Sequence, residues 1–203
     1  MFDLKTIIGV ITVVLGVVGY IPYLRNVLKG ITKPHVYTWF VWGSMTLIIF
    51  ALQISDNAGP GAWVTLVTAI LSLTIFALGI RQGDKDITKS DTLSFVAAIF
   101  ALGLWLFAEQ PVATTVLLVT VGMLGFIPTI RKSWNKPYTE TISTYAINSF
   151  RQGLSFFALT NYSILTWLFP VTWSIANGLF VLFLIIRRYG GKFPPSQKEV
   201  GLK

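Results

Sequence analysis

The sequence predicts an all-α integral membrane protein with seven transmembrane helices, and composition, spacing and an internal repeat lead to this fold class. Of the 203 residues, 54% are hydrophobic and only 12% are charged, with a mean hydropathy of +0.69. A soluble domain usually carries about a quarter charged residues. The charges are clustered, long apolar runs separate the clusters, and one phrase of the sequence occurs twice.

The apolar runs have the length of membrane-crossing helices. A hydrocarbon core of ~30 Å needs roughly 17–25 residues of helix. All but one of the runs reach that length, and the shortest reaches it with its flanks. The sequence therefore predicts one helix at each of these seven runs: Ile7–Leu24, Val36–Ile54, Ala62–Ile80, Leu93–Ala108, Val112–Ile130, Ile142–Leu159 and Ile164–Ile186.

Positive charges predict the orientation. Lysines and arginines follow the first, third, fifth and seventh runs, so alternating helices bring them to one side, and Lys5 is the only one expected opposite. The positive-inside rule then places the N-terminus outside and the C-terminus in the cytoplasm. The net charge of +8 is explained by basic residues that lie next to the anionic inner leaflet of a lipid bilayer, so no nucleic acid partner is expected. The short loops favour a prokaryotic plasma membrane.

The repeated phrase divides the chain. Residues 16–25 read GVVGYIPYLR and residues 122–131 read GMLGFIPTIR, and an offset of 106 positions aligns three helices of each half without a gap. Three crossings are an odd number, so one more helix is needed before the second unit can have the same orientation as the first. The sequence predicts two parallel three-helix bundles joined by a linker helix. The predicted units are 5–83 and 111–189 for the bundles, 84–110 for the linker and 190–203 for a disordered cytoplasmic tail.

Each copy of the phrase contains a proline within an apolar helix and a glycine about one turn before it. Proline removes a backbone hydrogen bond and kinks a helix, whereas glycine permits close helix contact. We expect these residues to form hinges of a cytoplasmic gate. The alternative is a static kink that only shapes packing. The four hinge residues are Pro22, Pro128, Gly19 and Gly125.

A polar stripe follows one face of the sixth predicted helix. Polar groups within a membrane usually face the bundle interior or a water-filled cavity. Arg151 has no Asp or Glu within any apolar run to neutralise it. Either backbone carbonyls, aromatic rings and water satisfy it, or an anionic substrate does, or it extends to the outer interface along its apolar stem. The stripe recurs at intervals of three and four: Thr141, Thr144, Tyr145, Asn148, Arg151, Gln152 and Ser155.

Asn177 follows Trp173 by one turn in the last helix, so both can face one cavity. An amide offers donors and an acceptor, and an indole offers a flat apolar surface, which together suit a small polar solute. The alternative is that Asn177 bonds a neighbouring helix in the core. Trp42 is the repeat-equivalent of Asn148. The predicted substrate-binding residues are therefore Asn177, Trp173, Asn148, Arg151 and Trp42.

These features resemble the PQ-loop superfamily, which includes the SWEET and SemiSWEET transporters. The proline motif, the arrangement of three, one and three helices and the outside N-terminus resemble the seven-helix SWEET type over residues 5–189. The chain departs from the family in two respects. Tyr23 and Thr129 stand where the family commonly has a Gln after the proline, and Leu71 stands at the position equivalent to Asn177, where the family commonly has a second Asn. The resemblance implies transport of a sugar and assigns a substrate contact to Asn177. The family also contains amino-acid exporters and a retrieval receptor, so it does not name the substrate.

The expected function is transport of a small polar metabolite, namely a sugar or a small carboxylate or amino acid, by alternating access. No carboxylate lies within the apolar runs, so the usual acid-based proton relay is missing and facilitated diffusion is expected. No paired-carboxylate site, nucleophile–base set, phosphate loop or metal cluster is recognisable, so we expect no enzyme activity, cofactor or metal. A membrane receptor or scaffold on the same fold is the alternative. The oligomeric state stays open, with a homo-oligomer as one option.

Overall fold

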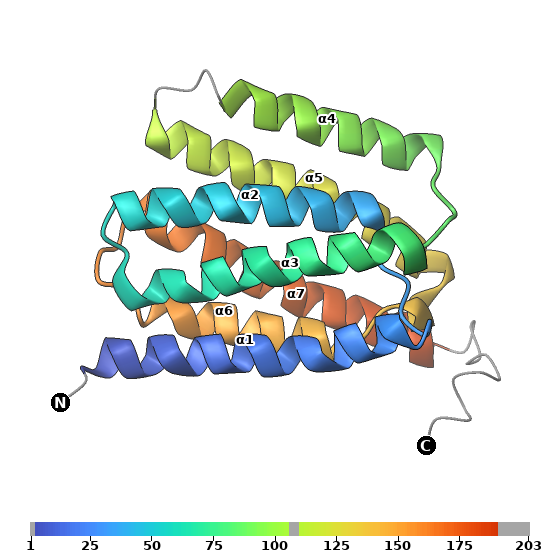
Figure 1. Cartoon of the computed structure of the whole chain (residues 1–203), viewed down its shortest axis with the longest axis horizontal. Helices are drawn as coiled ribbons and strands as arrows, with labels where there is room; N and C mark the ends of the chain where they lie inside the picture. Colours follow the sequence, from blue (N-terminus) through green and yellow to red (C-terminus); the bar gives the residue numbers. More distant parts are fainter. Residues whose placement is uncertain (1–2, 106–109, 191–203) are drawn as a thin grey trace.

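The computed structural model describes residues 3–105 and 110–190, and these form α-helices that lie side by side (Figure 1). Residues 191–203, which make up nearly all of the predicted tail, lie outside the described residues. Two short 3₁₀ helices, η1 (Gly59–Ala62) and η2 (Pro137–Thr139), precede two of the α-helices. The α-helices are α1 (Leu4–Leu28), α2 (Val36–Ser55), α3 (Trp63–Gln82), α4 (Lys89–Trp105), α5 (Pro111–Asn135), α6 (Ile142–Phe156) and α7 (Ile164–Tyr189).

Local chemistry accounts for several helix ends. The Asp3 side chain accepts a hydrogen bond of 2.7 Å from the Thr6 backbone N–H and so caps α1. Ser163 and Thr166 form a capping box at the start of α7. Pro111 begins α5, where the missing proline N–H costs nothing because no helical partner exists for it. The seven predicted runs therefore form helices, and the predicted end of the fourth run, Ala108, lies outside the described residues.

Within the described ranges, five helices are long and apolar enough to cross a membrane: α1, α2, α3 together with η1, α5 and α7. The other two are shorter, with 17 described residues in α4 and 15 residues in α6. Helix α6 ends at Phe156, before the predicted end at Leu159. The fold is thus helical, and its apolar helices are compatible with an integral membrane protein.

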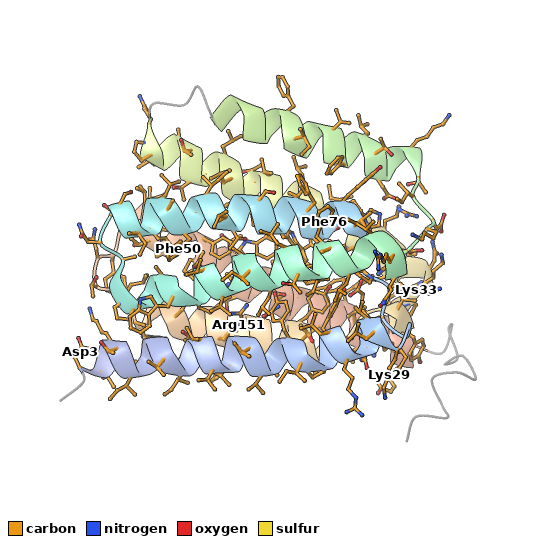
Figure 2. All side chains as sticks on the ribbon, in the orientation of Figure 1. Asp3, Lys29, Lys33, Phe50, Phe76 and Arg151 are labelled. Atoms are coloured by element: carbon orange, nitrogen blue, oxygen red, sulfur yellow. The ribbon has the colours of Figure 1, made fainter. Side chains whose placement is uncertain are left out.

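Apolar side chains cover the outside of the described bundle, and its interior holds polar side chains together with a hydrophobic core. On α1, Val14, Val18 and Ile21 are each about half exposed, and side chains of this kind cover the outer surface of the bundle (Figure 2). Polar residues of α6 face inward instead, and Arg151 is completely buried. This distribution is typical of a bundle whose outer surface meets lipid, since lipid tails do not solvate polar groups.

The helix contacts in the described structure follow the repeat in the sequence, and we call α1–α3 the first unit and α5–α7 the second unit. In the first unit α3 contacts both α1 and α2, and in the second unit α7 contacts both α5 and α6. The units meet where α1 packs on α6 and where α5 packs on α2. The 106-residue offset converts each of these two contacts into the other. Helix α4 packs outside this arrangement, against α5 and α2 (Figure 1).

Equivalent glycines stand at the contacts between the units. A Cβ added to Gly19 would lie 2.5 Å from Cγ2 of Ile147 on α6, and one added to Gly125 would lie 2.7 Å from Cγ1 of Val41 on α2. Val41 and Ile147 are themselves equivalent under the repeat offset. A side chain at either glycine would push the units apart. The glycines therefore permit the close helix contact that the sequence predicts, and the structure shows that this contact lies between the two units.

Charge separates the two ends of the bundle. Asp3 lies at one end of α1, and Lys29 and Lys33 lie at the other (Figure 2). We call the end with the α1–α2 and α5–α6 connections the basic end and the end that carries Asp3 the opposite end. Arg81 and Arg187 are also in the last turns of α3 and α7, which finish at the basic end.

Candidate functional site

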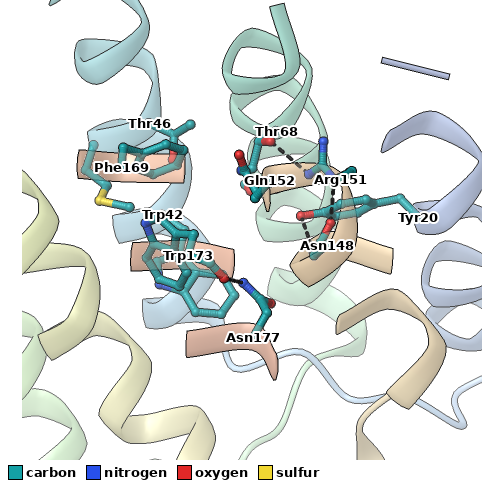
Figure 3. Close-up of a pocket in the computed structure, with 12 residues that line it drawn as sticks. Tyr20, Trp42, Thr46, Thr68, Asn148, Arg151, Gln152, Phe169, Trp173 and Asn177 are labelled. Carbon is teal, nitrogen blue, oxygen red and sulfur yellow. Dashed lines mark hydrogen bonds between the residues drawn. The ribbon is translucent and has the colours of Figure 1, made fainter. Parts of the chain in front are cut away.

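A small cavity lies between the two units (Figure 3). It offers about 20 Å³ for the centres of water-sized spheres, which is room for about one water molecule, because one water needs roughly 10–15 Å³ by this measure. Five helices contribute to its wall. The lining residues are Tyr20 of α1; Trp42, Met45 and Thr46 of α2; Thr68 and Ser72 of α3; Asn148, Arg151 and Gln152 of α6; and Phe169, Trp173 and Asn177 of α7.

The structure brings all five residues predicted to bind substrate to this one cavity. The Nδ2 of Asn177 donates a 2.7 Å hydrogen bond to the Trp173 carbonyl within α7. Asn148 Nδ2 donates to the Tyr20 hydroxyl at 3.2 Å. Trp42 Nε1 donates to the Gly122 carbonyl of α5 at 3.0 Å. The residues therefore line the cavity from both units.

Arg151 lies inside the bundle and does not extend to the outer interface. Its Nε donates to Asn148 Oδ1 at 2.8 Å, and its Nη2 donates to Thr68 Oγ1 at 2.8 Å. The guanidinium carbon lies 5.4 Å from the centre of the Tyr20 ring. Its Nη1 lies where a side chain at Gly16 would be, at 2.7 Å from an added Cβ. Neutral groups thus hold the guanidinium, and the glycine of the repeated phrase makes room for it.

Four polar atoms of the cavity residues have no hydrogen-bond partner within the described part of the chain. They are Arg151 Nη1, Trp173 Nε1, Ser72 Oγ and Gln152 Oε1. A buried polar atom without a partner costs about 1–3 kcal/mol, and more when it is charged. Such atoms are rare in folded proteins. Their gathering around one cavity indicates a site that a ligand or water completes.

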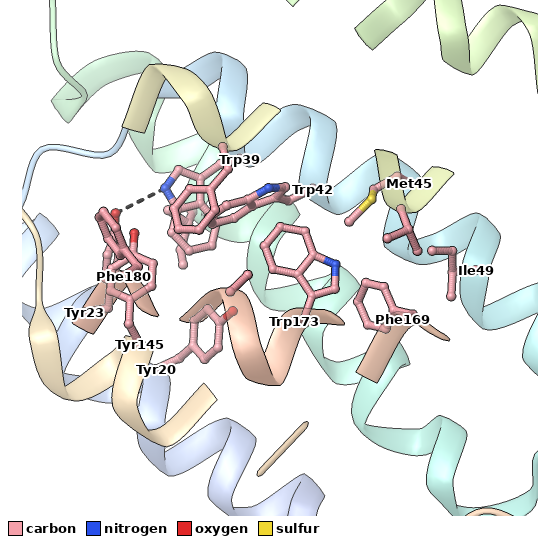
Figure 4. Close-up of a cluster of buried hydrophobic side chains, with 14 of the residues drawn as sticks. Tyr20, Tyr23, Trp39, Trp42, Met45, Ile49, Tyr145, Phe169, Trp173 and Phe180 are labelled. Atoms are coloured by element: carbon pink, nitrogen blue, oxygen red, sulfur yellow. Dashed lines mark hydrogen bonds between the residues drawn. The ribbon is translucent and has the colours of Figure 1, made fainter. Parts of the chain in front are cut away.

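Buried aromatic residues close the cavity toward the basic end (Figure 4). The Trp39 and Trp42 rings lie 5.1 Å apart and Trp42 lies 5.1 Å from Trp173, both in edge-to-face contact. We call this set the aromatic cluster: Tyr20, Tyr23, Trp39, Trp42, Phe126, Tyr145, Trp173 and Phe180. Residues of both units belong to it, so the cluster joins the two units on this side of the cavity.

A buried ion pair is in contact with the aromatic cluster. Glu140 Oε1 pairs with Lys132 Nζ, and Glu140 Oε2 accepts the hydroxyl groups of Tyr23 at 3.2 Å and Tyr145 at 2.9 Å. The Tyr23 hydroxyl also accepts from Trp39 Nε1 at 3.1 Å. Glu140 and Lys132 belong to the second unit, whereas Tyr23 and Trp39 belong to the first. This network therefore connects the two units.

Glu140 and Lys132 are not among the residues predicted from the sequence to form a site. Both stand among the charges next to the apolar runs, and Glu140 lies outside the runs in which a carboxylate would have indicated a proton relay. Each residue is only 2% exposed. One feature of the sequence could have pointed to Glu140, namely its position directly before the polar stripe that begins at Thr141. A single sequence does not show that this connection folds inward.

The opposite end of the bundle is closed by loops of both units. Asp56 accepts hydrogen bonds through Oδ2 from Ser163 Oγ and from Asn161 Nδ2. The Gly61 N–H donates to the Ala158 carbonyl at 3.1 Å. These contacts join the α2–α3 connection to the α6–α7 connection. The cavity is thus closed toward both ends of the bundle.

The predicted hinge residues lie where the units meet or beside that contact. Pro22 and Pro128 are interior to α1 and α5, and both helices continue past them. Gly19 and Gly125 contact the other unit about one turn before each proline. This placement agrees with a static kink and with a hinge alike, so the hinge stays a prediction.

Comparisons with protein-family models, with curated proteins and with solved structures yield no match.

Proposed function

We propose that this protein is a membrane transporter that moves a small polar metabolite by alternating access between its two three-helix units. One observation carries the proposal: a polar cavity with four unpartnered buried atoms lies between equivalent units and is closed toward both ends. Sites at the interface of structural repeats are the usual design of secondary transporters. The substrate contacts proposed are Asn177, Trp173, Asn148, Arg151 and Trp42, and the substrate classes are sugars and small carboxylates or amino acids.

The proposal includes a membrane topology. All seven helices cross the bilayer in a 3+1+3 arrangement, with α4 as the linker and the basic end in the cytoplasm, because positive residues are retained on that side. The short α6 crosses as part of the interior, where its polar face avoids lipid. This topology belongs to the proposed membership in the PQ-loop superfamily, of the SWEET type, and to a prokaryotic plasma membrane.

Transport then consists of opening the two ends in turn. Opening the basic end breaks the hydrogen bond between Tyr23 and Glu140 and separates the aromatic cluster. Opening the opposite end breaks the bonds that Asp56 accepts. Pro22 and Pro128 act as hinges, since each lacks the backbone hydrogen bond that would resist bending. Facilitated diffusion is the proposed mode.

The test is uptake into proteoliposomes of labelled sugars, amino acids and carboxylates, by the wild type and by Pro22→Ala/Pro128→Ala. We expect saturable uptake of one class by the wild type. The double variant should lose uptake and keep binding of the same solute, because the cavity residues are untouched. Equal uptake by both proteins would show that the prolines are static kinks.

The same experiment separates a transporter from a receptor. A receptor or scaffold on this fold binds solute saturably, and no labelled solute enters the vesicles. Binding without entry for the whole panel would therefore refute the transport proposal. A control with empty liposomes measures passive leak for each solute.

A further inference from the structure

The charge balance of the cavity points to one class of ligand. Arg151 is completely buried, and the cavity lining in the described structure contains no Asp or Glu. Its contacts are an amide oxygen, a hydroxyl group and an aromatic ring, all of them neutral. A buried charge without a counter-charge is strongly unfavourable. An anion in the cavity would supply the missing negative charge.

The unpartnered atoms favour the same class. Arg151 Nη1 and Trp173 Nε1 only donate hydrogen bonds, and Ser72 Oγ donates or accepts. Among the unpartnered cavity atoms of the described residues, Gln152 Oε1 is the one that can only accept. A carboxylate accepts several hydrogen bonds and matches the planar guanidinium. A zwitterionic amino acid fits less well, because its ammonium group would find no acid in the lining.

The repeat comparison shows that this charge is a specific feature of one unit. Met45 is the equivalent of Arg151 under the repeat offset. An added Cβ at Gly122 would lie 2.5 Å from the Met45 sulfur, just as one at Gly16 would meet the Arg151 guanidinium. The same architectural position thus holds an apolar side chain in one unit and a cation in the other. The cavity therefore has one charged side, which suits one negative group.

Cavity size limits the ligand. The space suffices for about one water molecule in this closed form, so even a small organic acid enters only when the helices around the cavity move apart. Much of the remaining wall is apolar, from Trp42, Met45, Phe169 and Trp173. A hexose carries many hydroxyl groups that this wall cannot satisfy, whereas a short organic acid has an apolar portion that contacts it.

We propose that the cavity between the units binds a small organic monocarboxylate, whose carboxylate pairs with Arg151. This proposal rests on the proposed function, since it names the substrate class of the same site. The carboxylate contacts Arg151 and receives further hydrogen bonds from the Trp173 indole and the Ser72 hydroxyl. Its short apolar portion lies against Met45 and Phe169.

Binding to the purified full-length protein is the first measurement, by titration of tryptophan fluorescence with sodium acetate, sodium L-lactate, methyl L-lactate, glucose and sodium chloride. We expect saturable binding of acetate or lactate alone. The methyl ester keeps the size of lactate without the charge, so equal binding of ester and acid would overturn the proposal. Saturation by chloride alone would overturn it as well, as would failure of both carboxylates to bind.

Variants then locate the site. Arg151→Gln should weaken carboxylate binding by about 30-fold or more, the usual effect of removing one partner of a buried charge pair. Arg25→Gln is the matched control, because it removes the same charge from an exposed position of α1, and its affinity should equal that of the wild type. Arg151→Lys keeps a charge and guards against misfolding of the glutamine variant. The ester comparison in the wild type needs no variant at all.

Uptake separates failure of this proposal from failure of the transport proposal. Uptake of glucose that Arg151→Gln does not change would support transport and refute carboxylate binding. Carboxylate binding that depends on Arg151, without uptake, would support this site and refute transport. Carboxylate uptake lost in Arg151→Gln and kept in Arg25→Gln would support both.

Discussion

The buried pair of Lys132 and Glu140 supports a prediction whose size follows from the structure. Glu140→Gln keeps one oxygen for the hydroxyl groups of Tyr23 and Tyr145, but it places an amide N–H₂ group against the Lys132 ammonium group. Lys132 keeps only its 2.5 Å hydrogen bond to the Lys33 carbonyl. Because removal of one partner leaves a buried charge unpaired, we expect a loss of about 3–5 kcal/mol in the free energy of unfolding.

A double variant that removes both charges tests whether the two charges depend on each other. In Glu140→Gln/Lys132→Met the apolar side chain replaces the ammonium group, and the Lys33 carbonyl loses its donor at a cost of about 1 kcal/mol. The double variant should therefore be more stable than Glu140→Gln by about 2 kcal/mol or more. Equilibrium unfolding by denaturing detergent in mixed micelles measures each value. A double variant that loses the sum of the losses measured for Glu140→Gln alone and for Lys132→Met alone would refute the reasoning, because the charges would then act independently.

Two further predictions concern packing and pH. Gly19→Ala should lower the free energy of unfolding by about 1–3 kcal/mol by overpacking against Ile147, and adding Ile147→Ala should recover part of this loss. Gly125→Ala should cause a similar loss, which Val41→Ala should partly recover. Unfolding in denaturing detergent measures all of these values. A variant of either glycine with unchanged stability would contradict the close contact. Burial lowers the pKa of His35 from its ordinary 6.5. The stability that burial of the neutral imidazole contributes is therefore complete above about pH 6.5, and it is lost as the pH falls through the lower pKa of the folded state. His35→Gln should flatten this decline of the thermal midpoint, and parallel curves for the two proteins would exclude His35 as its source.

Much of the cavity could be predicted because helical periodicity is a local property. Asn148 and Arg151 are three positions apart and share one face of α6, and polar groups avoid lipid, so the sequence predicted an inward direction for the polar stripe. It left open whether Arg151 extends to the outer interface instead. The repeated phrase predicted a close helix contact at Gly19 and Gly125, but that this contact joins the two units became known only from the structure. The contact of Arg151 with Thr68 and Tyr20 was not predictable, because it joins α6 to α3 and α1 across the bundle.

The ion pair shows where local reasoning ends. Glu140 follows η2 in a connection that looks solvent-exposed by composition, yet it is buried among hydroxyl and ammonium donors of two units. Burial of a loop carboxylate depends on which helices enclose it, and that is a property of the tertiary structure.

The sequence by itself determined the helical class, the repeat, the clustering of positive charge and the polar face of α6, because each depends on the order and spacing of residues along one chain. Only the tertiary structure decided that the two units meet through α1 with α6 and α5 with α2. It also decided that Arg151 has neutral neighbours and an unpartnered Nη1, and that both ends of the cavity are closed. These features depend on distances between helices far apart in the chain, which periodicity within one helix does not encode.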